Sequence, residues 1–206
     1  VADPVKRRQL DYALLQIETY LLPVSRQLRH QVIYGDGNEH NFILQPKKNS
    51  YQLKGLIDFG DMSDSFLAAE PAIALTYALM KTEEPEKTVR TLLAAYHKIN
   101  PLQPAELDVL YYLILARLVI SLTMAAWRHQ AEPENRYMTV SEEPGWKLLE
   151  TLLTSNPEKW RRLFYKSCKF EPARLWLESE KLLKFRNEHI SEAMSLTYRQ
   201  PLHITR

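Results

Sequence analysis

The order of apolar and polar positions predicts a chain built mostly of helices. Apolar residues recur at helical spacing from Pro4 to Arg29, and Asp3-Pro4 is a plausible start signal. Beyond residue 60 every predicted element is helical, with either a 3.6-residue repeat or a leading proline. These later helices are predicted over Pro71–Met80, Glu86–Ile99, Ala105–Trp127, Glu143–Leu153, Pro157–Tyr165 and Glu171–Met194.

A short region of β character lies between the first helix and the later ones. Residues 31–34 and 41–44 are β-type runs separated by a polar loop, and Tyr51–Asp58 is a third candidate strand. The segment 46–50 (Pro-Lys-Lys-Asn-Ser) predicts a hairpin connection. The predicted fold class is therefore mainly α (α+β), a helical body with a small β-hairpin region that carries two polar loops.

The segment Val109–Trp127 is apolar enough to raise the alternative of a membrane span. It is 19 residues long, but Arg117 lies near its centre, where a charge is costly in lipid. A helix that is apolar on all sides is also typical of a buried central helix. We expect the second case, with a carboxylate partner for Arg117, because an unpaired buried charge is strongly unfavourable.

Composition narrows the function classes. The 206 residues are 45% hydrophobic and 25% charged, with a net charge of +2, which is typical of a soluble globular chain without a nucleic-acid-binding surface. Cys168 is the single cysteine, and the first ten residues lack the apolar core of a signal peptide, so a cytoplasmic location is expected. Only five glycines are present, and no phosphate-binding glycine loop can be written from them.

The two polar loops, residues 34–41 and 57–62, together indicate phosphoryl transfer. An Asp-Gly turn alone marks a hairpin, and a calcium loop starting at Asp36 fails because Asn41 stands where glycine is required. Asp36 precedes Asn41 by five residues, and Asp58-Phe59-Gly60 follows after a hairpin, which is the kinase catalytic arrangement. One aspartate would orient the attacking hydroxyl and accept its proton, while an asparagine and a second aspartate would hold Mg²⁺.

These motifs resemble the aminoglycoside phosphotransferase and choline kinase-like superfamily, with the signature H-G-D-x-x-x-x-N followed by I-D-F-G/D. The amino-acid sequences of residues 55–62 and 70–78 are most similar to the hydroxylysine kinase-like branch. Residues 127–128 and 141–146 also resemble that branch. The resemblance implies a protein kinase-like fold, with ATP and Mg²⁺ as cofactors. It further implies Asp36 as the catalytic base and Asn41 and Asp58 as metal ligands.

Two departures from the family pattern qualify this interpretation. Tyr34 stands where the family has a histidine that supports the loop. A complete kinase also has an N-terminal lobe with a glycine-rich loop and a strand lysine, and the chain resembles the C-terminal lobe alone. We therefore expect an N-terminal lobe as partner, little activity from the 206 residues by themselves, and, as a further hypothesis, a homodimer through the exposed docking face.

Other residues are candidates for substrate binding. Asp61 directly follows the D-F-G motif and could receive a substrate ammonium, although capping a turn is an equal alternative. Asn38 could support the catalytic loop or only form a turn. Trp127 and Arg128 could reach the substrate, since an aromatic and polar cluster suits a cationic ligand, but packing is the plainer alternative. Glu70 is expected at a helix start or as the partner of Arg117.

The far end of the chain resembles the entry segment of a class III aminotransferase, a pyridoxal phosphate enzyme. We therefore divide the chain into a kinase-like phosphotransferase lobe, residues 1–170, and a helix and linker, residues 171–206, toward a possible aminotransferase domain. The predicted function is ATP-dependent transfer of the γ-phosphoryl group to a hydroxyl of a small amino alcohol or hydroxy amino acid. The alternative is a non-catalytic kinase-like module that scaffolds or regulates the attached aminotransferase.

Overall fold

The first helix, α1 (Pro4–Tyr20), begins where the sequence predicts and ends earlier. Asp3 caps it, since the Asp3 carboxylate accepts a hydrogen bond from the backbone N–H of Val5 at 2.7 Å. The prediction of one helix as far as Arg29 is wrong. Pro23 lacks a backbone N–H and its ring would clash with the preceding turn, so the chain continues as a 3₁₀ helix, η1 (Leu22–Gln27).

The computed structural model describes residues 3–131 and 142–170, all of which belong to one compact unit spanning residues Val1–Phe170. The predicted helix over 171–194 and the aminotransferase-like tail lie outside the described residues. The later helices confirm the predicted positions to within a few residues. They are α2 (Ala69–Lys81), α3 (Pro85–Ile99), α4 (Pro104–Ala131), α5 (Glu142–Thr154) and α6 (Pro157–Ser167).

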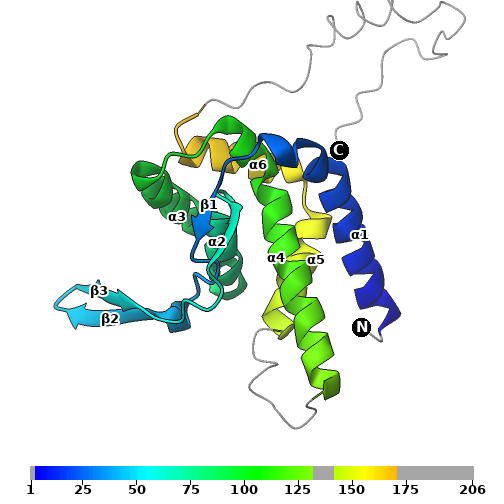
Figure 1. Cartoon of the computed structure of the whole chain (residues 1–206), viewed down its shortest axis with the longest axis horizontal. Helices are drawn as coiled ribbons and strands as arrows, with labels where there is room; N and C mark the ends of the chain where they lie inside the picture. Colours follow the sequence, from blue (N-terminus) through cyan, green and yellow to red (C-terminus); the bar gives the residue numbers. More distant parts are fainter. Residues whose placement is uncertain (1–2, 132–141, 171–206) are drawn as a thin grey trace, which may run out of the picture. The chain divides into compact units, whose positions relative to one another are not determined.

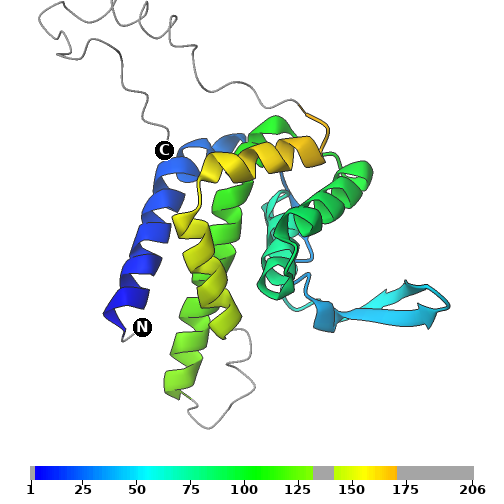
Figure 2. The same cartoon turned by 180° about the vertical axis from the view of Figure 1, so that it is seen from behind.

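Helix α4 forms the centre of the core. It packs against α1, α2, α5 and α6, and it lies between α1 and α2 in both views of the chain (Figures 1 and 2). By length and hydropathy alone, residues Pro104–Arg128 could cross a membrane. Half of the most apolar 18-residue stretch of this segment is, however, buried inside the protein. The surrounding helices explain why α4 is apolar on several sides. The large fully buried side chains of its described residues are Leu107, Leu110, Tyr111, Ile114, Leu115, Leu118 and Leu122.

Within the described part of the chain, four strands form two separate antiparallel pairs. Strands β2 (Phe42–Lys47) and β3 (Ser50–Leu56) make the predicted hairpin, with Phe42 opposite Leu56 and Lys47 opposite Ser50. Strand β1 (His30–Ile33) instead pairs with β4 (Ser63–Phe66). The sequence gives no signal for β4, so the expectation that everything beyond residue 60 is helical is wrong. Its Ser-Asp-Ser-Phe sequence forms a strand because β1 lies beside it.

The β2–β3 hairpin projects away from the helices in both views (Figures 1 and 2). Every residue of β2 is exposed, and so are large apolar side chains such as Leu44, Tyr51 and Leu53, the last two at 73% and 55% exposure. The small sheet of β1 and β4, by contrast, lies against the helices, with Phe66 packed on the core. The two polar loops connect the two strand pairs: residues 34–41 join β1 to β2, and residues 57–62 join β3 to β4.

Candidate active site

Asp36 is the centre of a network of polar side chains in the loop that follows β1. Its Oδ2 accepts hydrogen bonds from the side-chain amides of Asn38 and Asn41, each at 2.8 Å. The amide nitrogen of Asn41 also donates to the backbone carbonyl of Asp36 at 3.0 Å. Since a carboxylate oxygen only accepts, the Asn41 atom that faces Asp36 is the nitrogen, and its carbonyl oxygen is directed elsewhere.

The second carboxylate oxygen of Asp36 is held by two helices. Arg117 on α4 donates from Nη2 to Asp36 Oδ1 at 2.9 Å, and the hydroxyl of Tyr77 on α2 donates to the same oxygen at 3.1 Å. Arg117 Nη2 also donates to the Tyr77 hydroxyl, and its guanidinium lies 5.2 Å from the Tyr77 ring centre. The expected carboxylate partner of Arg117 is thus found, and it is Asp36; the alternative of Glu70 is wrong.

Burial favours the protonated form of Tyr77 in this network. The side chains of Asp36 and Arg117 are each 18% exposed. Burial raises the pKa of Tyr77 above its usual value, and the neighbouring charge of Arg117 only partly offsets that effect. The Tyr77 hydroxyl therefore keeps its proton near neutral pH and acts as a donor to Asp36.

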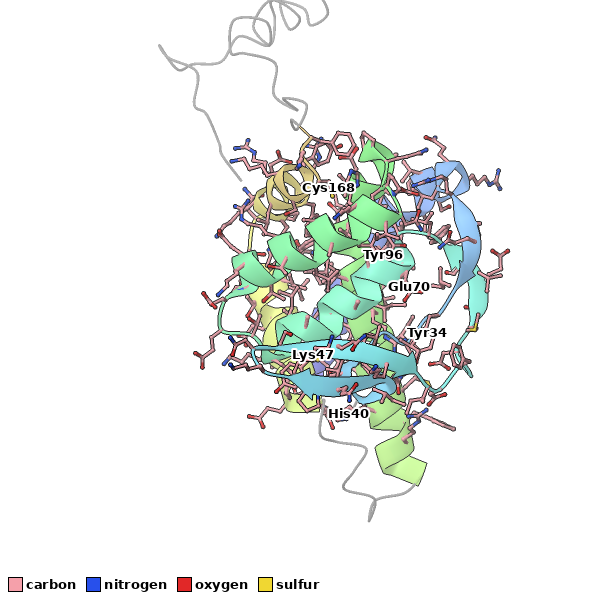
Figure 3. All side chains as sticks on the ribbon, turned by 90° about the vertical axis from the view of Figure 1, so that its left-hand side faces the viewer. Tyr34, His40, Lys47, Glu70, Tyr96 and Cys168 are labelled. Atoms are coloured by element: carbon pink, nitrogen blue, oxygen red, sulfur yellow. The ribbon has the colours of Figure 1, made fainter. Side chains whose placement is uncertain are left out.

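Glu70 holds the backbone of the same loop from the start of α2. Its Oε2 accepts hydrogen bonds from the backbone N–H groups of Tyr34 at 2.6 Å and Gly35 at 3.2 Å. Figure 3 shows Tyr34 and Glu70 close together. Glu70 lies in the first turn of α2, as expected, and its partners are two loop amides rather than Arg117.

Gly35 allows the loop to approach the second polar loop closely. Its φ is +80°, which favours glycine, and a Cβ atom built there would lie 2.6 Å from the backbone oxygen of Asp61. Any side chain at this position would separate the two loops. The sequence Gly35-Asp36 therefore brings the network around Asp36 and the residues after the D-F-G motif together.

The second loop carries Asp58 with much less support. Asp58 is exposed, has a φ of +60°, and accepts one long hydrogen bond, from the Gly60 N–H at 3.4 Å. The backbone links the two loops, because the Ile57 N–H donates to the Asn41 carbonyl at 3.1 Å and the Tyr34 hydroxyl donates to the Ile57 carbonyl. Tyr34 therefore supports the loop in the structure, and its ring contacts Phe59 edge-on with the centroids 5.6 Å apart.

The donor set of Asn41 and Asp58 fits Mg²⁺. Amide and carboxylate oxygens are hard ligands, and Mg²⁺ at phosphate sites is usually held by one or two protein groups together with the phosphates. Within residues 3–131 and 142–170, no group of three His, Cys, Asp or Glu side chains could hold a metal by itself. Asn41 and Asp58 alone would leave most positions around the cation to be filled by water and phosphate oxygens.

A cavity of about 640 Å³ opens beside Asp36. Of the predicted substrate residues, Asp61 and Arg128 line it, together with Asp36 itself. Trp127 is not among the lining residues and is 61% exposed, and Asn38 instead bonds to Asp36 within the loop. Other polar residues that line the cavity come from elements distant in sequence, so no local motif identifies them. They are Ser63 and Ser65 on β4 and Tyr77, Ser121 and Glu142 on helices.

Comparison with known proteins identifies the class to which this chain belongs. The model of the phosphotransferase enzyme family that includes aminoglycoside phosphotransferases matches residues 2–109, and the chain belongs to this family. The predicted superfamily and the predicted mainly-α kinase-like C-terminal lobe are thereby confirmed.

Similar curated proteins are hydroxylysine kinases. The chain is 29% identical to hydroxylysine kinase of Xenopus laevis over 166 residues, which cover 77% of the chain and 44% of that protein. It is 30% identical to the mouse (Mus musculus) hydroxylysine kinase over 147 residues, covering 68% of the chain and 39% of that protein. The zebrafish (Danio rerio) hydroxylysine kinase is 30% identical over 157 residues, which cover 74% of the chain and 44% of that protein. The chain spans about two fifths of the length of these relatives, and no solved structure matches it significantly.

Proposed function

We propose that the chain is the C-terminal lobe of an ATP- and Mg²⁺-dependent small-molecule kinase. The proposed reaction transfers the γ-phosphoryl group of ATP to a hydroxyl of a small amino alcohol or hydroxy amino acid. The observation that carries this proposal is the carboxylate of Asp36, positioned by four side-chain donors at the edge of a cavity, with Asn41 in direct contact.

In this proposal Asp36 is the catalytic base. It orients the acceptor hydroxyl and takes its proton as the acceptor oxygen forms a bond to the γ-phosphorus, while the bond from that phosphorus to the β,γ-bridging oxygen breaks and ADP leaves. The side-chain carbonyl oxygen of Asn41 and the carboxylate of Asp58 would hold Mg²⁺. When bound, the cation neutralises charge on the phosphate oxygens.

The charges around the cavity support an acceptor with both amine and acid character. Asp61 and Glu142 line it and could receive ammonium groups, whereas Arg117 and Arg128 supply positive charge. A hydroxy amino acid carries both kinds of group, and the similar curated proteins are named hydroxylysine kinases. Trp127 is exposed next to Arg128 and remains a proposed contact at the cavity mouth.

The proposal includes an N-terminal lobe of the same polypeptide as a partner. The length of the curated relatives supports it, and so does the exposure of apolar hairpin residues such as Leu44 and Leu53. That lobe would supply the remaining phosphate contacts, so we propose that the 206 residues alone turn over little ATP. Strong turnover by this chain by itself would contradict that part of the proposal.

The proposed function is tested with the full-length gene product that contains this chain. The protein is supplied with ATP and Mg²⁺ and screened against hydroxylysine, ethanolamine, choline and homoserine, and phosphorylated acceptor is measured directly. We expect Asp36→Asn to lower the rate by about 10²–10⁴-fold, which is the usual contribution of a general base. Asp64→Asn, an exposed carboxylate on β4, is the matched control and should keep the wild-type rate.

Two results would contradict the proposal. One is an Asp36→Asn variant that retains the wild-type rate with an identified acceptor. The other is the absence of transfer to any acceptor from a folded full-length protein that binds ATP. The second result would favour the alternative of a non-catalytic module attached to an aminotransferase.

A further inference from the structure

Asp36 has no acceptor position left for a substrate hydroxyl in the described structure. An ionised carboxylate offers about four lone-pair sites. Two side-chain donors bind Oδ2 and two bind Oδ1. A substrate hydroxyl can therefore donate to Asp36 only after one of the present donors has moved.

The donors on Oδ1 are the ones that can yield. Asn38 and Asn41 belong to the same loop as Asp36, and each also donates to the Asp36 backbone carbonyl, at 3.3 and 3.0 Å. Tyr77 and Arg117 reach Oδ1 from the helices that line the cavity, and both side chains are part of its wall. Oδ1 is therefore the oxygen on the cavity side, where an acceptor would bind.

Arg117 uses only part of its guanidinium edge in this arrangement. Nη2 contacts Asp36 and Tyr77, whereas Nε is buried and has no hydrogen-bond partner among the described residues. Nε and Nη2 point from the same edge, which binds a carboxylate through two parallel hydrogen bonds. Leaving a buried donor unpaired costs free energy, so the edge is poised for a second acceptor atom.

The same lobe contains a complete version of this contact. Arg29 donates from Nε to one oxygen of the buried Glu106 at 2.9 Å and from Nη2 to the other at 2.6 Å. In Arg29 both donors of this edge, Nε and Nη2, are hydrogen-bonded to a carboxylate, whereas in Arg117 only Nη2 is. Asp36 uses only the Nη2 donor of this edge in Arg117, so the edge can pair with a second carboxylate that enters from the cavity.

Resting on the proposed function, we propose that Arg117 determines specificity for acceptors that carry a carboxylate and controls access of the acceptor hydroxyl to Asp36 Oδ1. In the free lobe Arg117 holds Asp36 Oδ1. When an acceptor binds, the Nε and Nη2 edge takes the acceptor carboxylate, and Oδ1 becomes free to receive the acceptor hydroxyl. An acceptor without a carboxylate leaves Arg117 on Asp36 and reacts slowly.

The test compares two acceptors that differ only in the carboxylate. 5-Hydroxylysine and its carboxamide are given to the full-length gene product with ATP and Mg²⁺, and kcat/KM is measured for each. We expect the wild type to prefer the acid by about tenfold or more, because a site built to bind a polar group rejects the analogue that lacks it. In Arg117→Met the acid-to-amide ratio should fall to about one, since both the restraint and the carboxylate partner are gone.

Two further variants keep the test decisive. Arg117→Lys keeps the positive charge but cannot bind a carboxylate through two parallel hydrogen bonds, so it should give an intermediate acid-to-amide ratio. This variant tests the proposal if Arg117→Met does not fold. Arg90→Met removes an exposed arginine of α3, away from the cavity, and should keep the wild-type ratio. A merely structural role for Arg117 would lower both acceptors equally, and an unchanged ratio in the folded Arg117 variants would overturn the proposal.

Equilibrium binding separates this proposal from the proposed function. Calorimetric titration of the full-length protein with the acid and with the amide, without nucleotide, requires no turnover. Tighter binding of the acid by the wild type, lost in Arg117→Met, supports the role of Arg117 even if no phosphoryl transfer is found. Equal affinity of the wild type for acid and amide overturns it, even if Asp36→Asn abolishes the reaction and the proposed function stands.

Discussion

The two loops of the site present a carboxylate in opposite ways. Asp36 is 18% exposed and is held by four side-chain donors, two of them from helices of the core. Asp58 is exposed, follows the hairpin, and has one long contact to Gly60. The carboxylate of Asp36 is therefore fixed by side chains of this lobe. The backbone of the second loop is held by Tyr34 and Asn41, but the Asp58 carboxylate has little support.

This difference matches the proposed roles. A base must point at one atom of the acceptor, and rigid support from packed helices provides that direction. A metal ligand is positioned in part by the cation and by the phosphates bound to it, so it needs less support from the protein. The left-handed backbone at Asp58 adds to the contrast, because strained residues cluster where ligands later fix the geometry.

The largest expected effect separates the two carboxylates by their response to Mg²⁺. Asp58→Asn in the full-length protein should lower kcat/KM by about 100-fold or more, because a metal ligand contributes several kcal/mol to transition-state stabilisation. The Mg²⁺ concentration for half-maximal rate should rise in Asp58→Asn and remain unchanged in Asp36→Asn. Asparagine tolerates the left-handed conformation, so the fold should be preserved.

A Mg²⁺ titration of initial rates checks this prediction, with the unfolding temperature of each variant as the measure of folding. Equal Mg²⁺ dependence in the wild type and in Asp58→Asn would remove Asp58 from the metal site. An altered Mg²⁺ dependence in Asp36→Asn would show that the two loops do not divide the roles as proposed.

The next effect concerns stability and compares one glycine from each loop. Gly35→Ala should destabilise the chain by about 2 kcal/mol or more, since left-handed backbone alone costs an alanine roughly 1–2 kcal/mol and its Cβ would press on Asp61. Gly60→Ala is the matched control. Its Cβ would meet only Asp58 Oδ1, at 3.4 Å, without positive φ, so the change should stay within about 0.5 kcal/mol.

Thermal unfolding of the 206-residue chain distinguishes the two substitutions. About 2 kcal/mol corresponds to a fall in Tm of roughly 4–8 °C for a protein of this size. A Tm for Gly35→Ala within 1 °C of that for Gly60→Ala (a difference of about 0.5 kcal/mol or less) would contradict the close approach of the two loops.

The sequence predicts those parts of the molecule that depend on local contacts better than those that depend on contacts between distant segments. The loop signature, the hairpin and the helices from α2 to α6 were predicted, because periodicity and turn residues are local signals. Strand β4 and the contact between Arg117 and Asp36 were not, since each depends on segments that meet only in the fold. The expectation that a buried arginine needs a carboxylate was confirmed, but elementary electrostatics does not say which carboxylate is near.

A smaller effect is expected where Glu70 holds the loop backbone. Glu70→Gln keeps the shape of the side chain but replaces a charged acceptor of two N–H groups with a neutral one, at a cost of about 1–2 kcal/mol. Glu84→Gln, in an exposed ion pair with Lys87, is the control and should cost less than about 0.5 kcal/mol. Urea denaturation of the chain measures both, and equal midpoints would show that Glu70 does not stabilise the loop.

The smallest effect tests the link between the two loops. Tyr34→Phe removes the hydroxyl that donates to the Ile57 carbonyl but keeps the ring contact with Phe59, so stability should fall by about 1 kcal/mol or less. Because that hydrogen bond ties the Asp58 loop to the Asp36 loop, the half-maximal Mg²⁺ concentration of the full-length protein should still rise severalfold, by up to about fivefold. Tyr12→Phe, at an exposed tyrosine of α1, should change neither quantity. An unaltered Mg²⁺ dependence in Tyr34→Phe would mean that the backbone contact from Ile57 to Asn41 is enough to align the two carboxylates.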